Sequence, residues 1–286
     1  MSRLPMAGGA GPSAGPTAGP PPKIQLPGVR HLLAVASGKG GVGKSTVAVN
    51  LALAFSQQGK KVGLLDADIY GPSVPLMLGL QGVDPQTTAF PIEKFGLRIM
   101  SMGFLVTPEQ AVIWRGPMVD RYLLQFLMAL DWGQLDVLVL DLPPGTGDAQ
   151  LTLCQHAPLT GAVIVTTPQE VSLLDARRGL RMFQQVNVPV LGIVENMSYF
   201  VGDDGKRYEI FRHGGGSRCA AELGLPFLGE IPIDPQIALQ GDLGEPLVHS
   251  HPDRPVAQCY RALAGTTYAA LEQAAARLTP PPAVEL

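Results

Sequence analysis

A glycine-rich segment carries the clearest chemical information in this sequence. It lies between a short apolar run and a segment with helical spacing, and it reads Gly38-Lys39-Gly40-Gly41-Val42-Gly43-Lys44-Ser45-Thr46. This spacing matches G-x-x-x-x-G-K-[ST], in which backbone N–H groups and the start of the following helix bind phosphates. We therefore expect residues 38–46 to bind ATP, with Lys44 contacting the β- and γ-phosphates and Ser45 ligating Mg²⁺. A glycine-rich turn without a ligand is the alternative.

The loop contains a second lysine, Lys39, close to its start. In this respect it resembles the deviant Walker A group of ATPases, in which this lysine reaches the nucleotide of the partner subunit. The resemblance implies that Lys39 is catalytic and that hydrolysis depends on a homodimer. A cation supplied by a second subunit would stabilise the charge on the transferred phosphoryl group. The alternative is an ordinary surface lysine in solvent.

Three aspartates follow apolar runs and could complete the site. Asp66 and Asp68 end one run, and a spacing of two points both side chains to one side of an extended chain. We expect Asp68 to position the attacking water and Asp66 to support the loop, although two solvated loop carboxylates are the alternative. Asp141 ends another run in a Walker B pattern and is expected to hold Mg²⁺ through its water. Residues 143–148 follow directly and suit a switch that senses the γ-phosphate.

The elements that must position these residues are visible as apolar runs. Six continuous runs predict strands at residues 31–36, 62–65, 135–140, 162–166, 190–194 and 227–231. Helical spacing predicts helices at residues 45–58, 172–186 and 254–278. Continuous rather than alternating strands indicate a sheet covered on both faces. We therefore predict a doubly wound α/β fold, a mostly parallel sheet flanked by helices, as in P-loop NTPases of the deviant Walker A type.

The domain organisation follows from composition. Residues 1–28 are rich in glycine and proline and are expected to form a disordered tail, residues 29–278 the ATPase domain, and residues 279–286 a second tail. The chain has 286 residues, of which 46% are hydrophobic and 16% charged, with a net charge of −3. No apolar stretch reaches the roughly 18–20 residues of a membrane span. The negative net charge does not favour binding to nucleic acid, so no nucleic-acid partner is expected.

Cysteine usage points to a reducing compartment. The three cysteines, Cys154, Cys219 and Cys259, are far apart and form no Cys-x-x-Cys pair. The amino terminus resembles no signal peptide, and Arg3 is the only arginine before Arg30, which makes a poor mitochondrial presequence. We expect a cytoplasmic protein, with the mitochondrial matrix as the alternative.

Six segments together resemble the Mrp/Nbp35 family of P-loop ATPases, and the resemblance covers roughly residues 24–275. The segments are residues 37–46, 65–75, 101–104, 114–116, 141–148 and 195–198. The similarity is greatest to the branch that contains bacterial Mrp and the mitochondrial complex I assembly factor. It implies a homodimeric ATPase that carries iron–sulfur clusters between a scaffold and recipient apoproteins. It also implies that Asn196, Pro232 and Asp234 contact the adenine.

One departure from the family concerns the cluster ligands. The family carries Cys-x-x-Cys shortly after Asn-Met-Ser, and two such pairs hold one 4Fe–4S cluster across the dimer. Here Gly202 and Gly205 stand at these positions, in a stretch that predicts a β-hairpin turn. Cys219 is the nearest cysteine, but one per subunit gives two thiolates where four are usual. We expect Cys219, Cys154 and Cys259 to pack in the core, and the cluster ligands stay unassigned.

Three alternatives remain open at this point. The chain could be a family member that has lost cluster binding, or an ATPase switch similar to MinD or ParA without a cluster. The last predicted helix is alanine-rich and has Arg261 and Arg277 but no lysine, so it does not fit a basic membrane-surface helix. A small-molecule ligase or kinase using the same loop is the third alternative.

Overall fold

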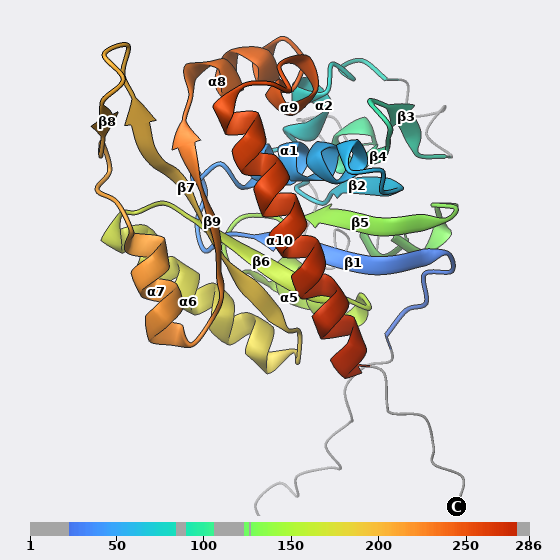
Figure 1. Ribbon diagram of the computed structural model, residues 1–286. Helices are drawn as coiled ribbons and strands as arrows, with labels where there is room; N and C mark the ends of the chain where they lie inside the picture. Colours follow the sequence, from blue (N-terminus) through green and yellow to red (C-terminus); the bar gives the residue numbers. More distant parts are fainter. Residues whose placement is uncertain (1–22, 84–89, 106–122, 126, 279–286) are drawn as a thin grey trace, which may run out of the picture.

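A central sheet organises the molecule. The computed structural model describes residues 23–83, 90–105, 123–125 and 127–278, and a nine-stranded sheet lies within them (Figure 1). Its strands are β1 Val29–Ala36, β2 Val62–Asp66, β3 Ile92–Lys94, β4 Leu97–Ser101, β5 Leu135–Asp141, β6 Gly161–Thr166, β7 Val190–Val201, β8 Arg207–Tyr208 and β9 Phe227–Ile233.

The order of the strands places β1 in the middle of the sheet. The order is β3-β4-β2-β5-β1-β6-β7-β8, and β9 pairs with β7 as well. The pairs among β4, β2, β5, β1, β6, β7 and β9 are parallel, whereas β3–β4 and β7–β8 are antiparallel. The chain after β1 continues to β2 on one side, and the chain after β5 continues to β6 on the other. In such sheets ligands bind at the carboxyl ends of the strands next to this reversal.

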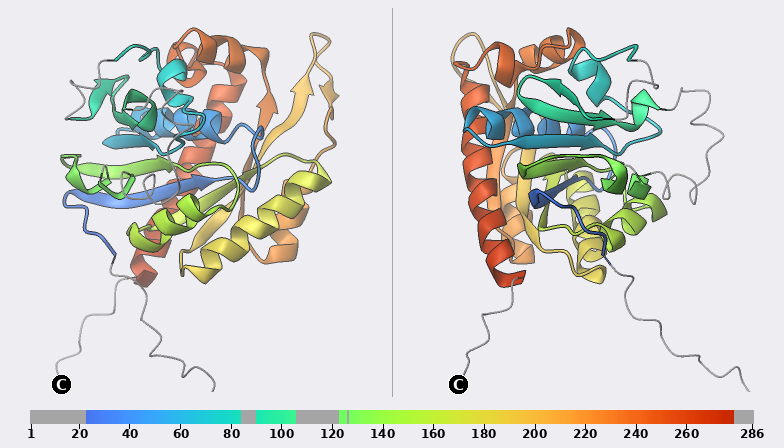
Figure 2. Two further views of the ribbon diagram at one scale, coloured as in Figure 1. Left: turned by 180° about the vertical axis from the view of Figure 1, so that it is seen from behind. Right: turned by 90° about the vertical axis from the view of Figure 1, so that its right-hand side faces the viewer.

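Helices cover both faces of the sheet, as Figure 2 shows from behind and from the side. The helices are α1 Lys44–Gln57, α2 Val74–Met77, α5 Asp148–His156, α6 Glu170–Gln185, α7 Gly215–Leu223, α8 Pro235–Asp242, α9 Leu247–Ser250 and α10 Pro255–Leu278. Helices α1 and α10 pack together on one face, and α6 packs on β6 and against α7 on the other. The doubly wound α/β fold is therefore confirmed.

The central strands are buried because helices lie on both sides of them. Residues 137–141 of β5 and 32–36 of β1 are all buried, in agreement with their continuous apolar sequence. All six predicted strands and all three predicted helices form. Additional elements were not predicted, among them the short hairpin of β3 and β4. Its turn contains Phe95 and Gly96 in the left-handed region of φ, and its sequence lacks a strong apolar run.

The segment before β1 contacts the domain. The N–H of Ile24 donates to the carbonyl of His156 over 2.9 Å, and Ile24 and Leu26 pack against the core. Residues 24 and 26, which lie in the predicted tail of residues 1–28, therefore already contact the domain. Strand β1 itself starts at Val29, and α10 ends at Leu278.

Within the described residues, no helix has the combination of length and apolar character that crossing a membrane requires.

Candidate nucleotide site

The glycine-rich loop joins the carboxyl end of β1 to the first turn of α1. Gly41 and Gly43 have φ values of 82° and 78°, a region in which only glycine is unstrained. A Cβ on Gly43 would also clash with the amide of Asn196, and a Cβ on Gly38 with the backbone of Asp175. No side chain caps the amino terminus of α1 in the described structure. Its free N–H groups can therefore bind an anion such as a phosphate.

Lys44 and Asp141 form a buried ion pair at the base of this loop. The Nζ of Lys44 lies 2.5 Å from Oδ1 of Asp141 and donates to Oγ of Ser45 over 3.0 Å. Lys44 is 6% exposed and Asp141 is fully buried. Burial raises the pKa of Asp141, and the nearby charge of Asp68 adds to this effect, whereas Lys44 opposes it.

Asp66 and Asp68 make separate contacts rather than sharing one site. Asp66 accepts hydrogen bonds from the hydroxyl of Ser101 over 2.9 Å and from the N–H groups of Asp68 and Val74 over 3.1 and 3.3 Å. Strand β2 ends at Asp66, so the alternation expected of an extended chain stops there. Burial, and then the charge of Asp141, raise the pKa of Asp66 to about 7. Asp66 therefore holds the β2–α2 loop, as expected for one member of the pair.

Asp68 lies in the turn after β2. Its Oδ1 accepts from the N–H groups of Tyr70 and Gly71 over 3.2 and 3.1 Å. These bonds orient the carboxylate while Asp68 remains close enough to raise the pKa of Asp141. Asp68 therefore lies near the Lys44–Asp141 pair.

The donor set suits a hard divalent cation. Oδ2 of Asp141 is buried and has no hydrogen-bond partner among the described residues. Asp66 and Asp68 lie close enough to Asp141 for their charges to interact with it, and Lys44 is a cation beside Asp141. Carboxylate and hydroxyl oxygens are the ligands that Mg²⁺ prefers. Ser45 and Asp141 are therefore the residues that would hold Mg²⁺.

Asn196 contacts the loop directly. Its Nδ2 donates to the carbonyl of Val42 over 2.9 Å, and the side chain is 5% exposed. Asn196 pairs in register with Ile231 of β9, so Pro232 follows on the neighbouring strand. The structure thus joins Asn196 to the phosphate loop across 154 residues of sequence.

Pro232 and Asp234 line a separate cavity of about 440 Å³. Asp234 caps α8 by accepting from the N–H of Gln236 over 2.9 Å, and it forms an ion pair with Arg254 over 3.1 Å. Asn196 does not line this cavity. Of the three residues that the family resemblance associates with adenine, Asn196 and Pro232 therefore lie on neighbouring strands and Asp234 caps α8, but the three do not line one pocket.

Lys39 lies apart from the Lys44–Asp141 pair. Its carbonyl accepts from the hydroxyl of Ser37 over 2.8 Å, and its side chain lines an open cavity of about 550 Å³. The other residues that line this cavity are Gln169, Glu170, Val171, Ile210, Phe211 and Arg212. Lys39 therefore belongs to the outer surface of the loop.

The hairpin predicted around Gly202 and Gly205 forms. Strands β7 and β8 pair antiparallel, with Phe200 opposite Tyr208. The N–H of Gly202 donates to the carbonyl of Lys206 over 2.9 Å, and Gly205 has a φ of 73°. The two glycines at the cysteine positions of the family thus shape the turn.

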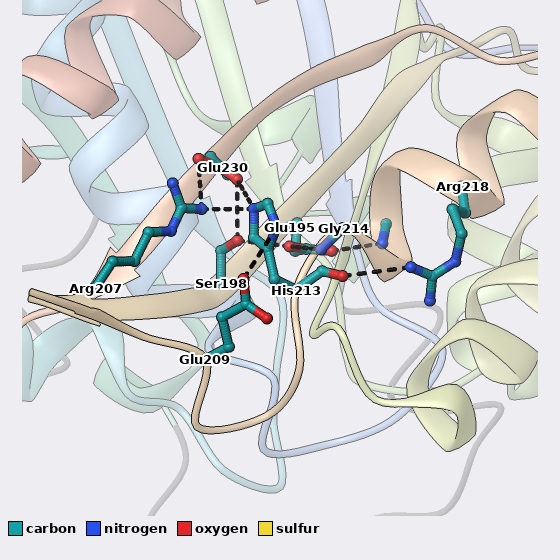
Figure 3. Close-up of polar contacts among 9 residues, drawn as sticks. Glu195, Ser198, Arg207, Glu209, His213, Gly214, Arg218 and Glu230 are labelled. Atoms are coloured by element: carbon teal, nitrogen blue, oxygen red, sulfur yellow. Dashed lines mark hydrogen bonds and ion pairs between the residues drawn. The ribbon is translucent and has the colours of Figure 1, made fainter.

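A polar network connects this hairpin to α7 (Figure 3). Glu195 is fully buried and accepts from the N–H groups of Gly214 and Gly216 over 3.1 and 2.5 Å, and from the hydroxyl of Ser198 over 2.5 Å. The carboxylate therefore satisfies the free amide groups at the start of α7. The same hydroxyl proton is shared with Glu230 of β9, whose carboxylate oxygen lies 3.1 Å from Oγ of Ser198.

Glu230 forms the exposed side of the network. It pairs with His213 over 2.7 Å and with Arg207 over 3.0 Å. Burial alone would raise the pKa of Glu230, but hydrogen bonds from His213 and Ser198 and the charge of Arg207 hold it below its usual value.

Glu195, His213 and Glu230 bring three potential metal-ligand atoms within 4.8 Å of one another. The carboxylate oxygens of both glutamates already accept hydrogen bonds from protein donors. Hard oxygens and one imidazole also differ from the thiolates that iron–sulfur clusters prefer. The network is therefore best explained as the structural connection between the hairpin and α7.

The cysteines lie away from the hairpin turn, and all three are free thiols. Cys219 is buried in α7, where it packs with Leu173 and Ile193, and burial raises its pKa. Burial raises the pKa of Cys154 to about 12, and that of the half-buried Cys259 as well. These environments match the core packing expected from the sequence and leave no ready thiolate.

Two site residues were missed by the sequence analysis. Ser101 is fully buried at the end of β4 and holds Asp66, and Glu195 anchors α7. Ser101 ends the apolar strand β4, whereas Glu195 directly follows the apolar run of residues 190–194 but lies within the longer strand β7. A polar residue at the end of an apolar run is the signal that could have identified both. Residues 114–116, which contribute to the family resemblance, lie outside the described residues.

Two relatives with similar sequences have names that refer to the carriage or transfer of iron–sulfur clusters. The "Iron-sulfur cluster carrier protein" of Aquifex aeolicus is 55% identical over 246 residues, which are 84% of this chain and 68% of that protein. The "Iron-sulfur cluster transfer protein NUBPL" of Dictyostelium discoideum is 50% identical over 245 residues, which are 84% of this chain and 76% of that protein.

Solved structures agree with this fold. A nucleotide-binding protein of Archaeoglobus fulgidus, in complex with ADP and with cobalt found in it, is 40% identical with a TM-score of 0.69. The match covers 80% of this chain and 90% of that one. The cell division ATPase MinD of Pyrococcus furiosus, 21% identical with a TM-score of 0.64 over 83% of this chain and 98% of that one, shares the fold alone.

The comparisons therefore favour the iron–sulfur relatives over a MinD-like or ParA-like switch. The family model described as NUBPL iron-transfer P-loop NTPase matches residues 28–267, which include the loop, all three aspartates and the hairpin. The chain belongs to the NUBPL iron-transfer family of P-loop NTPases.

Proposed function

We propose that this chain is an ATP-hydrolysing homodimer that carries iron–sulfur clusters to recipient proteins. The observation that carries the ATPase part is the Lys44–Asp141 pair beneath a glycine-rich loop, with a buried Asp141 oxygen that has no hydrogen-bond partner in the described part of the chain. The carrier part is supported by family membership and by relatives that are about half identical.

The loop residues each have a role in this proposal. The N–H groups of residues 38–43 and of Ser45 and Thr46 donate to the phosphates, and Lys44 exchanges Asp141 for the β- and γ-phosphate oxygens. Bound Mg²⁺ would neutralise phosphate charge, held by Ser45 and, through water, by Asp141. Asp68 orients the attacking water, because two backbone N–H groups already fix its carboxylate.

The base of the nucleotide lies toward β7 and β9 in this proposal. The amide of Asn196 donates a hydrogen bond to the carbonyl of Val42. When an adenine binds near the loop, Asn196 would exchange this hydrogen bond for one with the base. Pro232 and Asp234 border the same end of the sheet and complete the site from β9 and the start of α8.

A homodimer explains the surface around Lys39. Val171, Leu174 and Ile210 are 63%, 54% and 56% exposed, and the first and last line the cavity of Lys39. Exposed apolar side chains of this size favour contact with another protein surface. We propose that Lys39 reaches the nucleotide of the second subunit across this face.

The cluster, a 4Fe–4S unit in this proposal, is cargo from a scaffold to recipient apoproteins. Gly202 and Gly205 provide no ligand, and Cys219 is buried, so we propose transient binding through ligands that the partner proteins complete. Three free thiols fit a reducing compartment, the cytoplasm or, as the alternative, the mitochondrial matrix.

Two measurements test the proposal. Lys44→Ala should abolish ATP binding, whereas Asp68→Ala should keep binding and slow hydrolysis by about 100-fold.

Anaerobic incubation with iron and sulfide, followed by iron counting and visible absorbance, tests whether the chain carries a cluster. A colourless, iron-free dimer that also fails to transfer a cluster to an apoprotein would contradict the carrier part and favour a member that has lost cluster binding. Full ATP hydrolysis by Asp68→Ala would contradict the assignment of the water-positioning residue.

A further inference from the structure

Arg212 lines the same cavity as Lys39, at the outer surface of the phosphate loop. The cavity has a volume of about 550 Å³ and is bounded by the loop, the start of α6 and the segment between β8 and α7. We propose that Arg212 acts together with Lys39 as a second cation that binds the terminal phosphates of ATP held by a second copy of this chain. This inference rests on the proposed homodimeric ATPase.

The charges in the cavity are unbalanced. Neither the ammonium of Lys39 nor the guanidinium of Arg212 forms an ion pair or hydrogen bond with any described residue. Glu170 is the acidic residue of the lining, and it already lies 3.6 Å from Arg218. Two unpaired cations in one concave site provide a binding place for an oxyanion.

Arg212 contrasts with the arginines around it. Arg207 pairs with Glu230, and Arg218 pairs with Glu170. Arg177 and Arg178 of α6 likewise pair with Glu222 and Asp175. Most of the positive charge in this region is therefore neutralised within the subunit, and Arg212 is available for a group from outside it.

The backbone of Arg212 is strained. Its φ is 68°, in the left-handed region that side chains with a Cβ rarely adopt. The N–H of Arg212 donates to the carbonyl of Glu209 over 3.1 Å, which closes this turn. Glycine would fit here without strain, as it does two residues later at Gly214, whose φ is 72°. A strained arginine at the rim of a charged cavity is typical of a functional position.

The position of the cavity indicates which phosphate it binds. Of the loop residues 38–46, Lys39 contributes to the lining, whereas Lys44 and Ser45, whose side chains contact the subunit's own phosphates and Mg²⁺ in the proposed function, do not. Val171 and Ile210 are exposed beside the two cations and provide an apolar rim. A phosphate delivered by a second protein surface satisfies both features, because that surface covers the apolar side chains.

Replacement of Arg212 by glycine gives a variant that should fold. Arg212→Gly removes the cation and relieves the strained φ, so its thermal midpoint should be unchanged or raised by up to about 4 °C. ATP affinity should stay within about twofold, because the subunit's own site is intact. The ATPase rate of the dimer should fall by about 10- to 100-fold, and Arg212→Lys should recover part of it.

A matched control removes a surface cation outside the cavity. Arg261 lies on α10, so Arg261→Ala should keep the wild-type rate. A wild-type ATPase rate in Arg212→Gly would overturn the proposal. If Lys39→Ala and Lys44→Ala also kept full hydrolysis, the homodimeric ATPase itself would be wrong, which separates the two failures.

Mixed dimers distinguish the two sources of phosphate. A purified heterodimer pairs one Arg212→Gly subunit with one Lys44→Ala subunit, which keeps Arg212 but binds no ATP. If Arg212 acts on the partner's nucleotide, this heterodimer should hydrolyse ATP at about half the wild-type rate per dimer. If Arg212 acts on its own subunit's nucleotide, the heterodimer should be as slow as Arg212→Gly, and the proposed arrangement would be overturned.

Discussion

Removal of the loop lysine should destabilise the fold as well as the nucleotide site. In Lys44→Ala, Asp141 would keep a fully buried carboxylate whose ion-pair partner is gone. Among the residues that the structure describes, its Oδ2 has no hydrogen-bond partner in the wild type, and the charges of Asp66 and Asp68 lie nearby. Breaking a buried ion pair in this way typically lowers the free energy of unfolding by about 3–5 kcal/mol. At a urea m-value of about 2 kcal/mol/M, the midpoint would fall by about 2 M.

The loss should depend on pH in a definite direction. Burial already raises the pKa of Asp141 in the folded state, and Lys44 opposes that rise. Without Lys44 the folded-state pKa rises further above the unfolded value. A carboxyl group with a raised folded-state pKa favours the folded state at low pH, and this contribution is lost as pH rises. The difference in stability between wild type and Lys44→Ala should therefore be larger at pH 8 than at pH 5.5.

Urea unfolding followed by far-ultraviolet circular dichroism, with EDTA and no nucleotide, measures this effect. Lys39→Ala is the matched control from the same loop, and its free energy of unfolding should change by less than about 0.5 kcal/mol. Lys44→Ala combined with Asp141→Asn should recover most of the lost stability. Equal midpoints for wild type and Lys44→Ala at pH 8, or a difference that does not change with pH, would refute the reasoning.

Two further predictions concern buried carboxylates. Burial and the charge of Asp141 raise the pKa of Asp66 to about 7. The contribution of Asp66 to the free energy of unfolding should therefore decrease as the pH rises from about 4 to about 7. Asp66→Asn removes this dependence, so between pH 4 and pH 8 its free energy of unfolding should rise by about 2–4 kcal/mol relative to that of the wild type. Urea unfolding at both pH values measures the difference, and parallel pH profiles for the two proteins would contradict the prediction. Glu195→Ala leaves the N–H groups of Gly214 and Gly216 without their buried acceptor and should lower the free energy of unfolding by about 3–5 kcal/mol. Faster amide hydrogen exchange at the start of α7 should accompany this loss, and unchanged protection there would contradict the capping role.

The sequence by itself predicted the features that depend on neighbouring residues. The loop at residues 38–46, the apolar strands and the turn at Gly202 and Gly205 are each contained in a short stretch. Their conformations follow from glycine, hydrophobic periodicity and turn chemistry, which act over a few residues. The ATPase fold and the core position of Cys219 could therefore be predicted without a structure. The β3–β4 hairpin escaped prediction because its strands lack a continuous apolar run.

The tertiary structure decided which polar groups meet. Lys44 and Asp141 are 97 residues apart, and Ser101 contacts Asp66 across 35 residues. These contacts exist because the order β4-β2-β5-β1 places the carboxyl ends of four strands side by side.

The same holds for the surface and for the departures from sequence expectation. Asp66 and Asp68 separate because β2 ends between them, and the sequence carries no mark of that strand end. Strand β8 folds back antiparallel to β7, and the chain then continues to α7. Arg212, which follows β8, therefore lines one cavity with Lys39, and Glu195 of β7 accepts a hydrogen bond from the start of α7. Strand order and strand ends are set by packing of the whole sheet, and the functional partnerships follow from them.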